Sequence, residues 1–97
     1  MRVLIVEDEP AYVDALRVAL DAEGIDTVAA LDGREAIATF RNAVFDVVLL
    51  DLMLPSVSGL DVLRAIRVDS QVPVIVVSAK DSEADVVTAL ELGADDY

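Results

Sequence analysis

The sequence predicts an α/β fold in which helices pack on both faces of a doubly wound parallel sheet. Short runs rich in valine, leucine and isoleucine alternate four times with segments that carry apolar residues at helical spacing. The connections are only a few residues long, which favours parallel strands joined by right-handed crossovers. The composition agrees with this, because 56% of the 97 residues are hydrophobic and only 4% are aromatic. Such an aliphatic composition suits one small domain of helices packed on a sheet.

The first half of the chain contains two predicted strand–helix units. Residues 2–6 (RVLIV) are rich in β-branched side chains and residues 25–30 alternate weakly, so both predict strands. Helices are predicted at residues 10–22, which stop before Gly24, and at residues 33–41. The side chains at helical spacing, which we expect to face the core, are Tyr12, Leu16, Ala19, Leu20, Ala36, Ile37 and Phe40.

The second half contains two more units. Residues 46–50 (DVVLL) and 73–78 (PVIVVS) are continuously apolar, as expected of parallel strands that are covered on both faces. Helices are predicted at residues 58–68 and at residues 81–92, the latter ending at Gly93. The chain then finishes with ADDY, where a further strand is expected to begin, so we expect a truncated domain. The side chains at helical spacing in residues 58–68 are Leu60, Leu63, Ile66 and Arg67.

The charge and the missing residue types exclude several classes of function. Nineteen acidic and seven basic residues give a net charge of −12, which argues against nucleic-acid binding and favours a cation or a basic protein partner. The sequence has no cysteine and no histidine, so disulfides, thiolate metal sites and imidazole chemistry are excluded. No apolar run approaches the ~20 residues that cross a bilayer. We therefore expect a soluble, cytoplasmic domain without membrane contact.

Acidic side chains follow two of the predicted strands at the point where each strand ends. Glu7 and Asp8 follow residues 2–6, and Asp51 follows residues 46–50. Ligands of open parallel sheets bind beyond the carboxyl ends of the strands, so neighbouring strands would bring the three carboxylates together. Such a cluster needs a cation, and without histidine or cysteine the natural one is Mg²⁺. An aspartate beside Mg²⁺ can act as a nucleophile and become an aspartyl phosphate.

Five motifs, in order LIVEDEP, DVVLLDLMLP, SGLDVL, PVIVVSA and LELGADDY, cover essentially the whole chain. With them the sequence resembles the receiver domain of bacterial two-component response regulators. The LGADDY ending is especially similar to regulators that carry a winged-helix DNA-binding domain after the receiver. The resemblance implies a flavodoxin-like sheet of order 2-1-3-4-5, truncated here at the start of the fifth strand.

The resemblance also assigns roles at the acidic edge. It makes Asp51 the phosphoacceptor, and it makes Glu7 and Asp8 the acidic pair that organises Mg²⁺, with Asp8 the more direct ligand. The backbone carbonyl of Met53 is implied as a further metal ligand. Asp51 itself completes this implied metal site.

Further roles are implied for residues near the end of the chain. Ser78, which leaves the strand at 73–78 on the same edge, corresponds to the hydroxyl that hydrogen-bonds the phosphoryl group. Tyr97 corresponds to the aromatic residue that turns inward when that hydroxyl moves. Lys80, like Met53, occupies a variable position that tunes phosphate loss. The family's lysine, usually followed by proline, is expected three residues beyond Tyr97.

The implied partners follow from the same family. A sensor histidine kinase would supply the phosphoryl group. A homodimer would form through the face of the fourth helix, fifth strand and fifth helix, with exchange of the missing strand and helix as one expected route. DNA would be contacted only through a downstream domain, which this chain does not contain.

Three other functions remain as alternatives. A degenerate receiver would use the same surface for binding without phosphorylation. An Mg²⁺-dependent phosphohydrolase would need a second aspartate as acid/base, where this chain has Met53. A nucleotide-binding module would need a glycine-rich phosphate loop after the first strand, where this chain has EDEP.

Simpler structural readings also exist for the single residues. Asp51 alone could be a turn-forming acid before Pro55. Glu9, which precedes Pro10, is better explained as a helix cap on a solvated surface than as a metal ligand.

Overall fold

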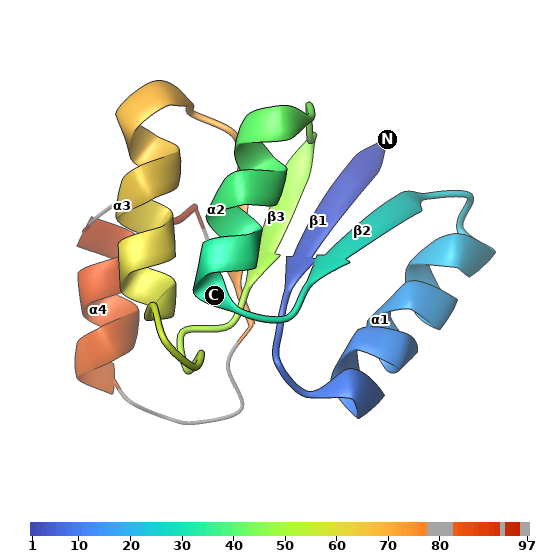
Figure 1. Cartoon of the computed structure of the whole chain (residues 1–97), viewed down its shortest axis with the longest axis horizontal. Coiled ribbons are helices and arrows are strands. Elements are labelled where there is room, and N and C mark those ends of the chain that lie inside the picture. The colour runs from blue at the N-terminus through green and yellow to red at the C-terminus, as the bar shows by residue number, and fades with distance from the viewer. Residues whose placement is uncertain (78–82, 92, 96–97) are drawn as a thin grey trace.

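The computed structural model describes residues 1–77, 83–91 and 93–95. Strands and helices alternate through these residues (Figure 1), as the sequence predicts. The strands are β1 (Arg2–Val6), β2 (Asp26–Ala30), β3 (Val47–Leu50) and β4 (Val74–Val76). The helices are α1 (Pro10–Ala22), α2 (Gly33–Asn42), α3 (Gly59–Asp69) and α4 (Glu83–Glu91).

The four strands form one parallel sheet in the order β2-β1-β3-β4. This order confirms the predicted order for the first four strands. β1 lies at the centre beside β3, and Val6 at its carboxyl end pairs with Leu50 at the carboxyl end of β3. The two central strands therefore end side by side, which sets the position of the acidic residues that follow them.

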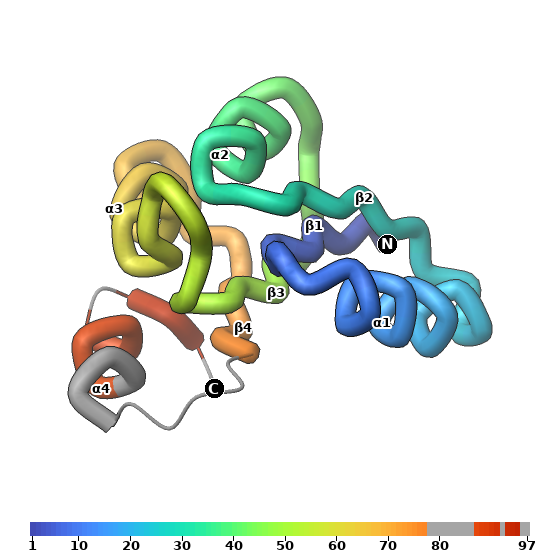
Figure 2. Tube along the Cα trace, turned by 60° about the horizontal axis from the view of Figure 1, so that its bottom comes forward, coloured from blue at the N-terminus to red at the C-terminus, as the bar shows by residue number. Residues whose placement is uncertain are grey.

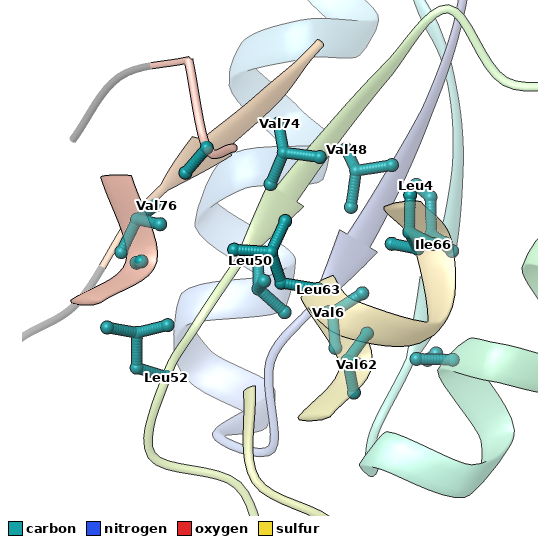
Figure 3. Close-up of a cluster of buried hydrophobic side chains, with 14 of the residues drawn as sticks. Leu4, Val6, Val48, Leu50, Leu52, Val62, Leu63, Ile66, Val74 and Val76 are labelled. Carbon is teal, nitrogen blue, oxygen red and sulfur yellow. The ribbon is translucent and has the colours of Figure 1, made fainter. Parts of the chain in front are cut away.

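Helices cover both faces of the sheet, so the doubly wound prediction is confirmed. Helices α2, α3 and α4 lie on one face and α1 lies on the other (Figure 2). The main core is formed where alternate strand residues meet α3 (Figure 3). Each fully buried aliphatic side chain there contributes about 1.5–3 kcal/mol relative to exposure. The labelled members of this core are Leu4, Val6, Val48, Leu50, Leu52, Val62, Leu63, Ile66, Val74 and Val76.

The opposite face of the sheet is covered less completely. Val3 and Ile5 of β1 are buried against Val13 of α1, whereas Leu49 of β3 is half-buried and Val77 is 42% exposed. The two-sided burial expected from the apolar runs at residues 46–50 and 73–78 is therefore incomplete on the α1 side for the described residues, and residue 78 lies outside them. Among the described residues, α1 packs over β1 and β2, so the α1 side of β3 and β4 is less completely covered.

The predicted buried face of α1 needs a correction. Tyr12 is 54% exposed and Ala19 is exposed, whereas Val13 is buried and Leu16 and Leu20 are half-buried. Positions 13, 16 and 20 share one side of a helix, so α1 is rotated by about one residue from the expected orientation. The core faces of α2 and α3 are confirmed at Ala36, Ile37, Phe40, Leu63 and Ile66.

Most element boundaries lie within one or two residues of those predicted. The strand expected at residues 73–78 is observed as Val74–Val76 (β4), the Val77 amide still donates to the Leu50 carbonyl at 2.9 Å, and residue 78 lies outside the described residues. No helix within the ranges that the structure describes is both long and apolar enough to cross a membrane.

Candidate functional site

The register of β1 and β3 brings the acidic residues to one edge of the sheet. Asp51 lies one residue beyond β3, and its amide donates to the Val6 carbonyl at 2.9 Å. Glu7 lies one residue beyond β1, and its amide donates to the Ala30 carbonyl at 3.1 Å. Both backbones thus continue the sheet's hydrogen bonding after the strands end. Glu7 and Asp51 are fixed beside each other by the sheet, not by a mobile loop.

Asp51 is the buried member of the site, with 8% of its surface exposed. Its Oδ1 atom accepts a hydrogen bond from the Met53 amide at 3.0 Å, which fixes the orientation of the carboxylate. The following residue, Leu52, is buried in the main core and anchors the loop. A carboxylate can therefore end an apolar strand here because it lies at the rim and has a backbone donor.

The start of α3 packs directly against the backbone of Asp51. The Gly59 amide donates to the Leu52 carbonyl at 3.1 Å. A Cβ atom at Gly59 would come within 2.3 Å of the Asp51 carbonyl oxygen and 2.5 Å of the Leu52 Cα atom. Ser58 caps the helix by accepting a hydrogen bond from the Asp61 amide at 3.3 Å. Only glycine permits this close approach, so α3 supports the loop that carries Asp51.

Glu7, Asp8 and Asp51 form one compact cluster of carboxylates. Each offers one oxygen, and these oxygens all lie within 4.8 Å of one another. Asp51 is buried, Glu7 is half-buried and Asp8 is exposed, so the cluster leads from the floor of the site to solvent. The amide of Glu9 donates to Glu7 Oε2 at 3.1 Å and helps to orient that side chain.

The proximity of these groups has an electrostatic consequence for Glu7. The pKa of the Glu7 carboxyl is raised from 4.5 to about 7, chiefly by burial and also by hydrogen bonding to Asp51, by the negative charge of Asp51 and by hydrogen bonding to Asp8. The hydrogen bond from the Glu9 amide opposes this shift. Near neutral pH, ionising all the carboxyl groups of the cluster therefore costs free energy. A bound cation would offset this cost by attracting the negative charges.

The donor set fits Mg²⁺. All three side-chain ligands are carboxylates, and a hard divalent cation with oxygen ligands is the ion that such a set prefers. The cavity beneath Glu7 and Asp51 has a volume of only about 10 Å³, which is room for about one water molecule, so the oxygens of the cluster are reached from the open rim above it. A larger hollow of about 310 Å³ lies beside Phe45 and Asp69, near the amino end of β3, away from the carboxylates.

The other predicted site residues are placed as follows. Met53 has a side chain that is 49% exposed and an amide that orients Asp51, while the metal-binding role of its carbonyl stays a prediction. Ser78, Lys80 and Tyr97 lie outside the described residues, so their roles stay predictions as well. Glu9 is the N-terminal cap residue of α1, as expected, but its side chain makes no capping hydrogen bond.

Two contributors to the site were missed in the sequence. One is the Met53 amide, whose bond to Asp51 depends on a turn that no sequence pattern specified. The other is Gly59, which packs against the Asp51 backbone. The sequence did contain a signal for Gly59. Glycine is a poor helix former, so a glycine directly after a capping serine suggests that close packing requires it there.

Comparison with known proteins identifies the family to which this geometry corresponds. Residues 3–97 match the family described as "Response regulator receiver domain". The chain is 55% identical over 95 residues to "Sensory transduction protein RegX3" of Mycobacterium tuberculosis, covering 98% of this chain and 42% of that protein. It is 47% identical over 96 residues to "DNA-binding response regulator MtrA" of Mycolicibacterium smegmatis, covering 99% of this chain and 42% of that protein. The chain thus spans about two fifths of the length of these relatives.

Solved structures agree with this result. The BeF3-activated N-terminal receiver domain of Klebsiella pneumoniae RstA superposes with a TM-score of 0.94 at 31% identity, covering 100% of this chain and 83% of that one. The response regulator protein TrrA of Thermotoga maritima, in complex with Mg(2+)-BeF, superposes with a TM-score of 0.89 at 32% identity. That match covers 99% of this chain and 83% of the other.

Proposed function

The chain belongs to the response regulator receiver family, and from this we propose that it is a phosphorylation-dependent switch whose phosphoacceptor is Asp51. The observation that carries the proposal is the convergence of Glu7, Asp8 and Asp51, whose ligand oxygens lie within 4.8 Å at the ends of two adjacent strands. A buried, oriented carboxylate between two other acids suits a nucleophile that works beside a divalent cation.

In this proposal Glu7, Asp8 and Asp51 hold Mg²⁺, together with the backbone carbonyl of Met53. The ion would supply positive charge that offsets repulsion between the carboxylates and an incoming phosphoryl group. Asp8, as the exposed acid, is the ligand that an arriving hydrated ion meets first. Asp51 remains oriented by the Met53 amide while it reacts.

The phosphoryl donor must be external, because the chain has no histidine. In transfer from a sensor histidine kinase, the P–N bond of phosphohistidine breaks as a P–O bond forms to the Asp51 carboxylate. The leaving imidazole nitrogen keeps the electron pair and takes up a proton. A small acyl phosphate can replace the kinase, in which case a P–O bond breaks and a carboxylate leaves. Ser78 would donate a hydrogen bond to the bound phosphoryl group, and Tyr97 would turn inward in response.

The proposal extends to a longer protein in which this domain would regulate transcription. The mycobacterial relatives are more than twice as long as this chain, and one is described as a DNA-binding response regulator. We therefore propose that phosphorylation controls homodimerisation through the face that includes α4, and that a downstream domain contacts DNA in the cytoplasm. Transcription would then respond to the state of Asp51.

The phosphohydrolase alternative is less well supported by the site. A phosphohydrolase would need its acid/base at the position of Met53. Here the side chain is a thioether, which cannot transfer a proton, and the amide already donates a hydrogen bond to Asp51. The degenerate-receiver alternative is disfavoured because the described acidic residues are all present and brought together.

Intact mass after incubation with acetyl phosphate and Mg²⁺ tests the proposal. The wild type should gain one phosphate, which chelation of Mg²⁺ should prevent. Asp51→Asn should abolish the adduct, whereas Asp21→Asn, at an exposed position of α1, should leave it unchanged. An adduct that survives in Asp51→Asn contradicts the assignment, absence of any adduct in the wild type favours a degenerate receiver, and continuous release of inorganic phosphate favours a hydrolase.

A further inference from the structure

A second polar centre lies at the opposite end of β4, around Arg67 of α3. The Arg67 side chain is only 12% exposed. Its Nε atom donates to the Gly93 carbonyl at 3.0 Å, and its Nη2 atom donates to the same carbonyl at 2.7 Å. Its Nη1 atom donates to the carbonyls of Ser70 at 3.3 Å and Val72 at 2.7 Å. Nη2 also donates to Asp95 Oδ2 at 3.1 Å.

These bonds employ all the donors that the guanidinium possesses. Arginine has five N–H groups in a rigid planar fork, and five hydrogen bonds are present here. Two of the acceptors belong to the connection between α3 and β4, and the others follow α4. Arg67 therefore joins two segments that are more than twenty residues apart in the chain. A lysine could not reach these acceptors together, because its ammonium is a single point of charge.

Asp95 ties the same segment to the start of β4. Its Oδ2 atom accepts from the Val74 amide at 2.8 Å, and its own amide donates to the Val74 carbonyl at 2.9 Å. The chain leaving α4 is thus set in register with β4 at this residue. Because Asp95 also accepts from Arg67, one carboxylate couples the guanidinium to the sheet.

Gly93 allows the turn to approach Arg67. Its φ angle of +105° is one that other residues rarely adopt, and a Cβ atom there would lie 3.0 Å from Arg67 Nε. The Gly93 amide donates to the Leu90 carbonyl, and the Ala94 amide donates to the Ala89 carbonyl at 2.9 Å. The turn therefore also caps the carboxyl end of α4. The network of Arg67, Gly93 and Asp95, which we call the Arg67 latch, therefore fixes this end of the helix.

The side chains that the structure describes in α4, at residues 87–91, are mostly exposed. Among the α4 side chains that the structure describes, Ala89 is buried, whereas Val87 is 53% exposed and Leu90 is 45% exposed. A methyl group contributes little apolar contact compared with the leucine and isoleucine side chains of α3. The latch therefore attaches the carboxyl end of α4 to the rest of the fold through polar contacts that do not depend on these exposed side chains.

We propose that Arg67 is a positioning residue that anchors the carboxyl end of α4 and sets the register of the following chain, so that α4 pivots about this end when the switch operates. The anchoring follows from the latch alone, and the pivot rests on the function proposed for Asp51. The latch lies at the amino end of β4 and Asp51 lies at the carboxyl edge of the sheet. A rearrangement that starts near Asp51 would therefore move the far end of α4 and leave the latched end in place.

Amide hydrogen exchange measured by NMR tests the anchor in the resting protein. Arg67→Gln should accelerate exchange of the Ala94 and Asp95 amides by about tenfold or more, as expected when a buried charged donor is lost. Arg67→Lys should not restore slow exchange. The matched control Arg64→Gln removes an exposed arginine of the same helix, paired to Asp61 at 2.7 Å, and should leave both amides unchanged.

Asp95→Asn provides a milder variant should Arg67→Gln fail to fold. The amide oxygen can still accept from Val74, so only the charge pairing with Arg67 is lost, and the acceleration should be smaller than in Arg67→Gln. Unchanged exchange in Arg67→Gln, full rescue by Arg67→Lys, or a larger effect of Asp95→Asn would each overturn the anchoring role of the guanidinium.

Beryllofluoride with Mg²⁺, used as the phosphoryl probe, tests the pivot. In the wild type the amide resonances of Val87 and Thr88 should shift more than those of Gly93, Ala94 and Asp95, and in Arg67→Gln the shifts should extend into the latch. Equal shifts at both ends of α4 in the wild type would refute the pivot. Absence of any shift around Asp51 would instead refute the proposed switch and the pivot with it, whereas the exchange result for the resting latch would stand.

Discussion

In the metal-free protein, the carboxylate cluster should lower the stability as pH rises. Glu7→Gln should remove this loss of stability. The folded protein binds a proton at Glu7 more tightly than the unfolded chain, because burial and Asp51 raise its pKa from 4.5 to about 7. The unfolded state therefore binds fewer protons between these values, and the free energy of unfolding contributed by Glu7 falls as pH rises through this window. The contribution is fully present below about 4.5 and lost above about 7.

The size of the effect follows from the pKa shift and from the exposure of the group. A fully shielded carboxyl with this shift would account for about 3 kcal/mol. Glu7 is half-buried at the rim, where solvent screens its interactions, so we expect ~1 kcal/mol. For a domain of this size that corresponds to about 4–8 °C in melting temperature.

Thermal and chemical denaturation at pH 4 and pH 8, with Mg²⁺ removed, measure this difference. Glu7→Gln should match the wild type at pH 4 and exceed its stability by ~1 kcal/mol at pH 8. Added Mg²⁺ at pH 8 should stabilise the wild type more than the variant. The control Glu9→Gln, at an exposed acid two residues away, should not change the pH dependence. A stability difference between Glu7→Gln and the wild type that is the same at both pH values, or that favours the wild type at pH 8, would refute the electrostatic account of the site.

Three further variants test the metal site, the support of the loop and the core. Asp8→Ala should reduce stabilisation by Mg²⁺ in a thermal titration more than Glu9→Ala does, since only Asp8 contributes to the cluster. Gly59→Ala should lower the free energy of unfolding by roughly 2 kcal/mol or more, measured by urea denaturation, because its Cβ would overlap the Asp51 backbone. Leu63→Ala should lower it by about 2–5 kcal/mol in the same assay, because Leu63 is fully buried in the main core.

Neighbouring substitutions provide the controls. Equal Mg²⁺ responses in the Asp8 and Glu9 variants would mean that the acids lining the site are misassigned. Ser58→Ala, which removes the cap beside Gly59 and the hydroxyl's hydrogen bond to Asp61, should cost about 1 kcal/mol. Val44→Ala, at a side chain that is 84% exposed, should change stability by less than about 0.5 kcal/mol. A Gly59 or Leu63 effect no larger than its control would contradict the packing described here.

The fold and the edge of the sheet that carries the acidic cluster were predictable because they depend on local patterns. The runs at residues 2–6 and 46–50 are apolar and β-branched, and each is followed at once by acids, so both the strands and the position of Asp51 followed from the sequence. The side of α1 that faces the sheet could not be predicted as reliably from the sequence. Tyr12 and Val13 are adjacent apolar residues, and which of them faces the sheet depends on packing against β1 and β2.

The long-range polar contacts could not be predicted from patterns in the sequence. Arg67 was assigned only to helical spacing, yet its acceptors lie at Gly93 and Asp95, 26 and 28 residues further along the chain. The orientation of Asp51 by the Met53 amide likewise depends on the turn after β3. Such contacts are specified by the tertiary arrangement, because hydrogen-bond partners far apart in sequence leave no periodic signal.

The site of the phosphoryl group is the most direct test of this account. Borohydride reduction of the protein after reaction with acetyl phosphate and Mg²⁺ converts an aspartyl phosphate to homoserine, and tandem mass spectrometry of peptides then locates the modified residue. Homoserine is expected at position 51 and at no other acidic position, and none is expected when Mg²⁺ is chelated. Homoserine at Asp8 or Asp46, or unmodified Asp51 in a protein that has gained phosphate, would contradict it.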